Sequence, residues 1–183
     1  MPNSPVSNVV PLERPPVRQS TLVRSGLEHT FDVFVREIGS WWPLKPFSMG
    51  EGRVRSVTFE RAVGGRVYET WNDESEHDWG TVLVWDPPHR FCMTWNVTGT
   101  PTEVEIAFVA EAEDRTRVEL EHRGWDRLSE AELVRACALP GGYLGGSFTE
   151  GWSRILACFV VAAQSEPESH ETEALPASGQ PAT

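Results

Sequence analysis

The sequence has few of the residues that metal or thiol chemistry requires. Its three cysteines, Cys92, Cys137 and Cys158, are far apart, and they form neither a CxxC pair nor a zinc-ligand pattern. The HExxH motif of zinc hydrolases is absent as well. We therefore expect no metal site and no cofactor, and we expect the cysteines to be reduced thiols in a cytoplasmic protein.

Positive charge and long apolar runs are also scarce. The net charge is −11, Lys45 is the only lysine, and residues 165–183 contain glutamates but no lysine or arginine. Because nucleic acids and anionic membrane surfaces are bound by basic patches, neither is an expected partner. No run of about 18 apolar residues occurs, and the first residues lack the basic and then apolar pattern of a secretory signal. The sequence thus predicts neither membrane insertion nor secretion.

The 183 residues divide into one domain and two ends. Residues 1–16 are rich in proline and show no periodicity, so we expect a disordered lead-in. The glutamate-rich composition of residues 165–183 predicts a disordered acidic tail. Residues 17–164 have the length of a single domain, and most of the eight tryptophans and eight phenylalanines are available for its core or for lining a cavity.

Strand patterns dominate this domain. A first strand is expected at 17–24, and an amphipathic helix follows, with apolar residues at helical spacing from Leu27 to Ile38. Short turns rich in glycine, proline, asparagine and aspartate then separate six further strands. These strands are expected at 53–61, 66–71, 80–85, 90–97, 103–110 and 116–122. The order predicts an antiparallel meander.

Two helices close the domain, and each has a capping-box pattern at its start. Ser129 and Glu132 predict a short helix to about residue 138, and Ser147 and Glu150 predict a long helix over 147–164. The long helix has an apolar stripe that needs a partner surface, formed by Phe148, Trp152, Ile155, Leu156 and Phe159. We predict an α+β fold in which a curved antiparallel sheet wraps around this helix, with one to two short helices after the first strand.

Alternation assigns faces to the last two strands but not to the middle ones. Val104, Ile106 and Phe108 share one face of their strand, and His122 falls on the apolar face of the next strand. Strand 90–97 is apolar on both faces and cannot be oriented. Arg66 and Glu69 have opposite parity, so one of them is expected to point inward.

The sequence resembles the SRPBCC superfamily (START-like, helix-grip fold), in the group related to the C-terminal domain of the activator of Hsp90 ATPase. The segments that carry the resemblance are FDVFVREIGSWWP (31–43), AVGGRVYE (62–69), WGTVLVWDPPHRFCMTW (79–95), TEVEIAFVAEAEDRTRVELEHRGW (102–125) and EGWSRIL (150–156). The resemblance implies a seven-stranded antiparallel sheet around the last helix, with a mainly apolar cavity between them. It does not fix the function, because this fold is used for carriers, receptors, cyclases and other roles.

Within such a fold, a candidate ligand cavity follows from the aromatic and polar residues that face the last helix. Trp71, Trp95, Trp152 and Phe159 would form its walls, and Glu69 and His122 would anchor polar groups. The glycines of the segment before the helix would form a mobile entrance: Gly141, Gly142, Gly145 and Gly146. Solid packing of the same aromatic residues is the alternative.

Three functions remain open at this point. The first is non-catalytic binding of a small hydrophobic or amphipathic molecule. The second is an enzyme of the aromatase/cyclase kind, which would shape a reactive chain in the cavity while His122 or Glu69 moves protons. The third is a module for a chaperone or another, unknown protein partner, with Trp41 or Trp42 exposed on its surface.

Overall fold

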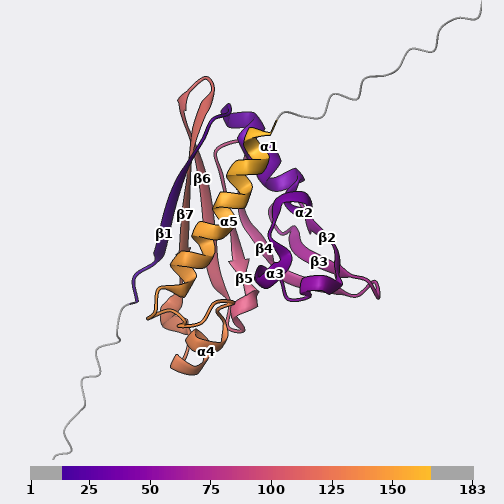
Figure 1. The fold of residues 1–183 in the computed structure, drawn as a ribbon, viewed down its shortest axis with the longest axis vertical. Coiled ribbons are helices and arrows are strands. Elements are labelled where there is room, and N and C mark those ends of the chain that lie inside the picture. The colour runs from indigo at the N-terminus through magenta and orange to yellow at the C-terminus, as the bar shows by residue number, and fades with distance from the viewer. Residues whose placement is uncertain (1–13, 166–183) are drawn as a thin grey trace, which may run out of the picture.

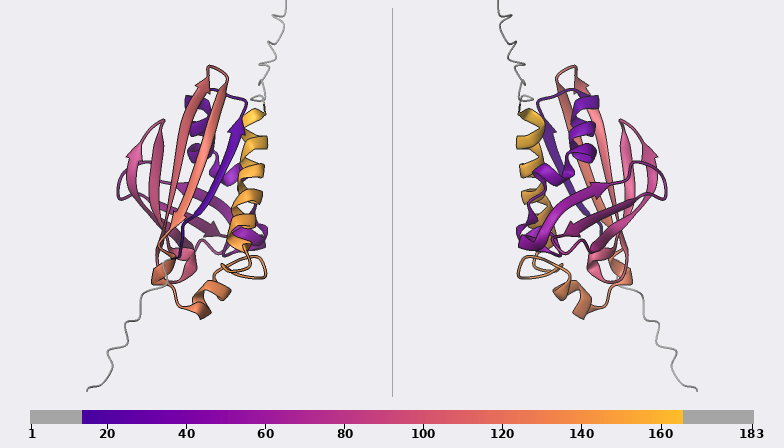
Figure 2. Two further views of the ribbon diagram at one scale, coloured as in Figure 1. Left: turned by 90° about the vertical axis from the view of Figure 1, so that its left-hand side faces the viewer. Right: turned by 90° about the vertical axis from the view of Figure 1, so that its right-hand side faces the viewer.

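The computed structural model describes residues 14–165, and the expected lead-in and tail lie outside this range except at their inner ends. Seven antiparallel strands form one sheet in the order β1-β7-β6-β5-β4-β3-β2. The strands are β1 (Val17–Val23), β2 (Val54–Phe59), β3 (Arg66–Trp71), β4 (Glu76–Asp86), β5 (Arg90–Trp95), β6 (Thr102–Ala112) and β7 (Arg115–Arg123). Figure 1 shows the long helix α5 (Ser147–Gln164) crossing the sheet, and Figure 2 shows it on one side of the sheet only. The predicted helix-grip fold is confirmed.

The remaining helices are short. The helix predicted from Leu27 to Ile38 is divided into α1 (Leu27–Arg36) and α2 (Ile38–Trp41), and α3 (Leu44–Phe47) follows. The α4 helix (Glu130–Arg135) begins at the predicted capping box of Ser129 and Glu132. Three turns of 3₁₀ helix complete the elements, η1 (Glu51–Arg53), η2 (Asn96–Thr98) and η3 (Trp125–Arg127). None of the helices in the described range is long and apolar enough to span a bilayer.

The start of α5 differs from its prediction. Gly146 precedes the helix with a φ of 73°, and the Ser147 hydroxyl donates a hydrogen bond to the Pro140 carbonyl rather than capping the helix. A capping serine needs an extended backbone just before the first turn, and here a left-handed glycine occupies that place. Glu150 instead pairs with Arg154 along the helix surface. The predicted capping box at this helix is therefore wrong, although the position of the helix is right.

The inner face of the sheet carries the core. Val104, Ile106 and Phe108 on β6 are buried, as their alternation predicted, and the inward face of β5 carries Phe91 and Met93. Phe159 on α5 packs against aromatic rings of the preceding helices, 4.8 Å from Phe34 and 5.2 Å from Trp41 between ring centroids. The C-terminal half of α5 thus packs against a solid aromatic core.

The inner end of the predicted lead-in contacts the domain. Arg14 donates hydrogen bonds to the carbonyl oxygens of Trp125 and Leu128, and the Tyr143 hydroxyl donates to the carbonyl of Pro15. Residues 14–16 are thus hydrogen-bonded to the folded domain, and they tie β1 to the segment that precedes α5.

Candidate functional site

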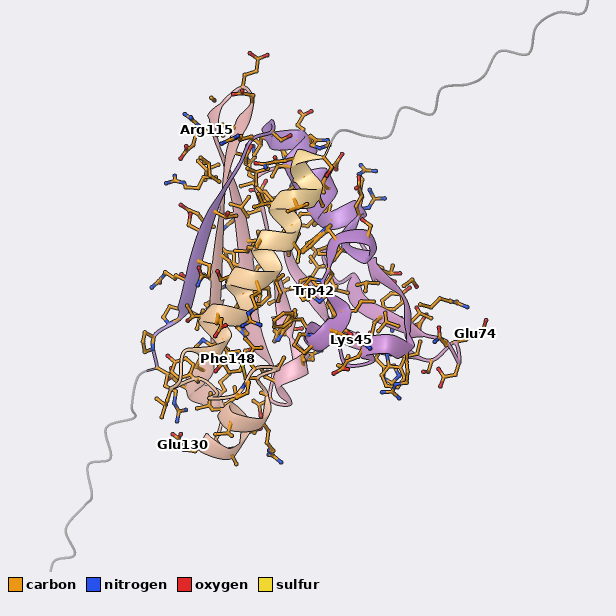
Figure 3. The ribbon with its side chains drawn as sticks, viewed as in Figure 1. Trp42, Lys45, Glu74, Arg115, Glu130 and Phe148 are labelled. Atoms are coloured by element: carbon orange, nitrogen blue, oxygen red, sulfur yellow. The ribbon has the colours of Figure 1, made fainter. Side chains whose placement is uncertain are left out.

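A cavity of about 230 Å³ lies beneath the N-terminal half of α5. In Figure 3, Trp42 lies beside α5 and Phe148 near its lower end, and both belong to the cavity wall. Exposed Met49 and Arg135 lie at the rim. The full lining is Trp42, Pro46, Phe47, Ser48, Met49, Trp95, Val97, His122, Arg135, Ala136, Cys137, Ala138, Ser147, Phe148, Gly151, Trp152 and Ile155.

One helix face forms the roof of this cavity. Phe148, Gly151, Trp152 and Ile155 recur at three- and four-residue spacing, so they lie along the same side of α5. Gly151 is inside the helix, where glycine is disfavoured by about 1 kcal/mol relative to alanine. A Cβ atom at this position would lie 3.3 Å from the Phe47 ring, so the missing side chain leaves room between α5 and α3.

His122 is fully buried at the inner end of the cavity, and both of its ring nitrogens are hydrogen-bonded. The Trp152 indole N–H donates to its Nδ1 at 3.0 Å, and its Nε2 lies 2.8 Å from the Thr102 hydroxyl. Because Nδ1 accepts, Nε2 carries the proton and donates to Thr102, whose hydroxyl lies 3.3 Å from the Trp95 carbonyl that can accept its proton. Burial lowers the pKa of His122 to about 3, so the ring is neutral. This histidine positions Trp152, and it could act as a general base only if that contact broke.

The neutral state of His122 predicts a pH dependence of stability. In the unfolded chain the ring binds a proton below its ordinary pKa of about 6.5, whereas the folded ring stays neutral down to about 3. The free energy of unfolding should therefore fall by up to about 1.4 kcal/mol per pH unit as the pH drops through this window. Urea unfolding at pH 7, 6 and 5 should show a steeper loss for the wild type than for His122→Gln.

Exposed His89 provides the control, because His89→Gln should keep the slope of the wild type. An independent readout is the ¹⁵N chemical shift of the His122 ring, which should report the neutral Nε2–H form at pH 5. A protonated ring at that pH, or equal slopes for wild type and His122→Gln, would contradict the assignment.

The other polar groups of the cavity wall differ in whether they already form hydrogen bonds within the chain. The hydroxyls of Ser48 and Ser147 donate to the Leu44 and Pro140 carbonyl oxygens. Cys137 is a free thiol whose pKa is raised by burial, so it is a weak nucleophile at neutral pH. The described residues contain no cluster of acidic, histidine or cysteine side chains that could hold a metal ion. The cavity is thus mainly apolar and aromatic, with Arg135 as the charged group at its rim.

The sequence model of the family described as "Activator of Hsp90 ATPase homolog 1-like protein" matches residues 27–163. The chain belongs to this family. The resemblance drawn from the sequence segments is thereby confirmed. Among curated proteins, none matches the chain.

Solved structures with the same fold include two of particular interest. One is described as "An anthrahydroquino-Gama-pyrone synthase Txn09 complexed with SUM"; it is 35% identical, with a TM-score of 0.54, over 84% of this chain and 99% of that one. The other, a self-sacrificing resistance protein, CalC from Micromonospora echinospora, is 25% identical, with a TM-score of 0.57, over 81% and 94% of the two chains. An AHSA1-like protein from Aeromonas hydrophila, 17% identical with a TM-score of 0.50 over 79% and 90%, shows the fold alone.

This member of the AHSA1-like family brings three of the predicted site residues together. Trp95, His122 and Trp152 line the cavity, and the ring centroids of Trp95 and Trp152 are 5.3 Å apart. Phe159 does not line it, because it is four residues beyond Ile155 on α5 and lies in the solid core under α1 and α2. Trp71 and Glu69 do not line it either, because β3 is near the opposite edge of the sheet from β7.

Glu69 forms a separate buried cluster of hydrogen bonds behind the cavity wall. Its carboxylate accepts from the Trp71 indole at 2.6 Å, the Trp79 indole at 3.1 Å and the Met49 backbone N–H at 3.2 Å. A Cβ atom at Gly50 would lie 2.3 Å from the Trp71 Nε1, so only glycine permits this close approach. Glu69 therefore points inward, as one of the two parity alternatives predicted, and it fixes the segment that carries Met49 rather than a ligand.

Trp71, at the end of β3, is held by flat groups that pack on its ring. The His77 ring stacks on it with 3.6 Å between centroids, and the Arg53 guanidinium lies 3.7 Å from the ring centroid. Arg66, the other parity alternative, faces outward and pairs with Glu76 and Asp78.

The predicted entrance glycines occupy the turn between α4 and α5. Gly141, Gly142 and Gly146 have positive φ angles, and Gly142 is buried against the backbone of Leu133. None of the four glycines lines the cavity, although Ala138 before them and Ser147 after them do. Their role as a mobile entrance stays a prediction.

Several cavity residues were missed by the sequence reasoning. Trp42, Phe47 and Arg135 come from segments whose approach to α5 depends on the tertiary fold. Gly151 was the one detectable signal, because a glycine inside an apolar helix is unfavourable unless space is needed beside it.

Proposed function

We propose that this protein binds a flat, mainly aromatic small molecule in the cavity under α5. The observation that carries the proposal is the aromatic wall: the rings of Trp42, Phe47, Trp95, Phe148 and Trp152 border one cavity that is open at its rim. Aromatic rings offer large apolar surfaces and prefer offset or edge-to-face contacts with other rings. A planar ligand gains the most contact from such walls.

The size of the cavity limits the ligand. An apolar cavity of roughly 150 Å³ in another protein takes up benzene, and this cavity measures about 230 Å³. A ligand, or the part of it held inside, therefore has about two fused rings. Longer molecules would extend past the rim between Met49 and Arg135.

Two solved relatives support a small-molecule role. The Txn09 protein is described as a synthase of an aromatic pyrone, and its structure contains a bound molecule. CalC is described as a resistance protein. The cytoplasmic location expected from the sequence is part of the proposal, since all three cysteines are free thiols.

Calorimetric titration with naphthalene tests the binding function. Naphthalene is flat, has two fused rings and lacks polar groups, so it probes the aromatic wall alone. Saturable binding with one site per chain is the expected result. If naphthalene and chromone, a two-ring ketone of similar size, both fail to bind, the proposal is wrong.

A second candidate is catalysis of ring closure on an aromatic substrate, which the 35% identity to the pyrone synthase favours. In this reading the cavity would hold an open side chain in a folded shape, and chemistry would come from proximity. His122 is committed to Trp152 and Glu69 lies outside the cavity, so neither supplies a ready base in this arrangement. Incubation with an aryl ketone whose side chain can close to a γ-pyrone, followed by mass and absorbance, would detect turnover.

The protein-partner alternative rested on an exposed Trp41 or Trp42, and neither side chain is exposed. Trp41 and Trp42, the residues expected to offer an exposed aromatic surface, are each only 5% exposed. Their indole N–H groups are bonded to backbone carbonyls within the chain.

A further inference from the structure

The cavity wall includes one tryptophan whose indole N–H has no acceptor among residues 14–165. Six of the eight tryptophans donate to an acceptor within the chain: Trp41, Trp42, Trp71, Trp79, Trp125 and Trp152. Within residues 14–165, Trp85 and Trp95 are the two whose N–H has no such partner, and only Trp95 lines the cavity. The wall thus offers a ligand a hydrogen-bond donor.

The Trp95 donor is accessible and held in place. In the described range, the only fully buried side-chain nitrogen or oxygen without a partner is Arg117 Nε, so the Trp95 N–H is not completely enclosed by protein atoms. Its ring is surrounded by the rings of Trp152 at 5.3 Å, Trp79 at 6.0 Å and His122 at 6.1 Å between centroids. A donor fixed by packing loses little entropy when it binds an acceptor.

Arg135 supplies a cation at the rim of the same cavity. Its Nε donates to the Ala131 carbonyl one turn earlier, and among the residues described it forms no ion pair. Glu132, on the same helix, is engaged by Ser129 and by the Thr100 hydroxyl. The remaining N–H groups of Arg135 are therefore available to an anionic oxygen.

We propose that the ligand is a two-ring aromatic keto acid, whose carbonyl oxygen accepts from Trp95 and whose carboxylate or other anionic oxygen pairs with Arg135. This inference rests on the proposed binding function and adds the chemistry of recognition. Apolar rings fill the space between α5 and α3, and two oxygens separated along the ring system select the ligand.

Three probes of nearly equal ring area separate these contributions. Naphthalene has only the rings, chromone adds a carbonyl, and chromone-2-carboxylate adds an anion. A neutral hydrogen bond contributes about fivefold in affinity, and a partly exposed charged one adds about a further fivefold. Calorimetry on the wild type is expected to give affinities that rise in that order.

Two conservative variants assign each gain to a residue. Trp95→Phe removes the donor together with part of the wall, so it should lower chromone affinity about fivefold more than it lowers naphthalene affinity. Arg135→Met should remove only the gain from the carboxylate. The controls are Trp85→Phe, which removes the other unpaired indole N–H outside the cavity, and Arg154→Met, which removes an exposed arginine of α5.

The outcomes distinguish this inference from the binding function. Equal affinity of the wild type for all three probes would overturn the inference and leave ring binding intact, even if Trp95→Phe did not fold. Equal losses of chromone and naphthalene affinity in Trp95→Phe would also overturn it, since the residue would then act only as a wall and not as a donor. No binding of any probe would refute both proposals.

Discussion

Replacing Gly151 by leucine is expected to weaken binding of two-ring ligands strongly while leaving the fold intact. Gly151 lines the cavity, and its Cβ position is already 3.3 Å from the Phe47 ring. A leucine adds three carbons beyond Cβ, and these must enter the cavity or push Phe47 into it. Because a ligand and this side chain cannot share the space, the affinity for naphthalene should fall about tenfold or more.

Gly151→Ala is the matched control for this prediction. Alanine favours the helix by about 1 kcal/mol and requires a shift of only a few tenths of an ångström at Phe47. It should bind naphthalene within about twofold of the wild type and unfold at an equal or higher temperature. Undiminished binding by a folded Gly151→Leu protein would place the ligand elsewhere.

Replacing Glu69 by leucine is expected to cost about 3 kcal/mol or more in the free energy of unfolding. The substitution leaves two indole N–H groups and the Met49 backbone N–H without their acceptor, and an unpaired buried donor costs about 1–3 kcal/mol. Since Glu69 also fixes the segment before β2, ligand binding at the Met49 rim should weaken. Urea unfolding, with calorimetry on the folded fraction, measures both effects.

Glu76→Gln is the control for this prediction, because it removes the charge of a different glutamate on the same β3–β4 hairpin. Glu76 pairs with Arg66 on the exposed face, where an ion pair contributes about 0–1 kcal/mol. Its unfolding free energy should stay close to that of the wild type. A similar small effect for Glu69→Leu would show that the buried cluster does not stabilise the rim.

Most of the fold could be predicted from local patterns because those patterns repeat within each element. The alternation of β6 and β7 placed Val104 and His122 on the inner face, and both are buried there. The strand expected at 80–85 begins earlier, at Glu76, because it extends along β3 as a hairpin with polar side chains outside. Its polar composition concealed that extension.

The candidate site was predictable only where one element decided the geometry. Trp95, His122 and Trp152 all line the cavity. Parity directed His122 inward and the helix face directed Trp152, whereas Trp95 lies on a strand that alternation could not orient. Parity required either Arg66 or Glu69 to point inward without deciding which, and it could not show that β3 lies too far along the curved sheet to reach the cavity. Phe159 lies outside the cavity for a similar reason, since the face of α5 that it shares with Trp152 continues into the packed core.

By itself the sequence determined the order of the elements, the antiparallel sheet around α5 and the inward direction of His122, because these depend on periodicities of two and 3.6 residues. Only the tertiary structure decided how the core is divided. The same apolar stripe of α5 covers a packed aromatic core at Phe159 and a cavity of about 230 Å³ at Trp152. The difference depends on which segments meet the helix, namely α1 and α2 at one end and the Phe47 segment opposite Gly151 at the other. Empty volume is a property of side chains from distant segments meeting in space, and no pattern along the chain records it.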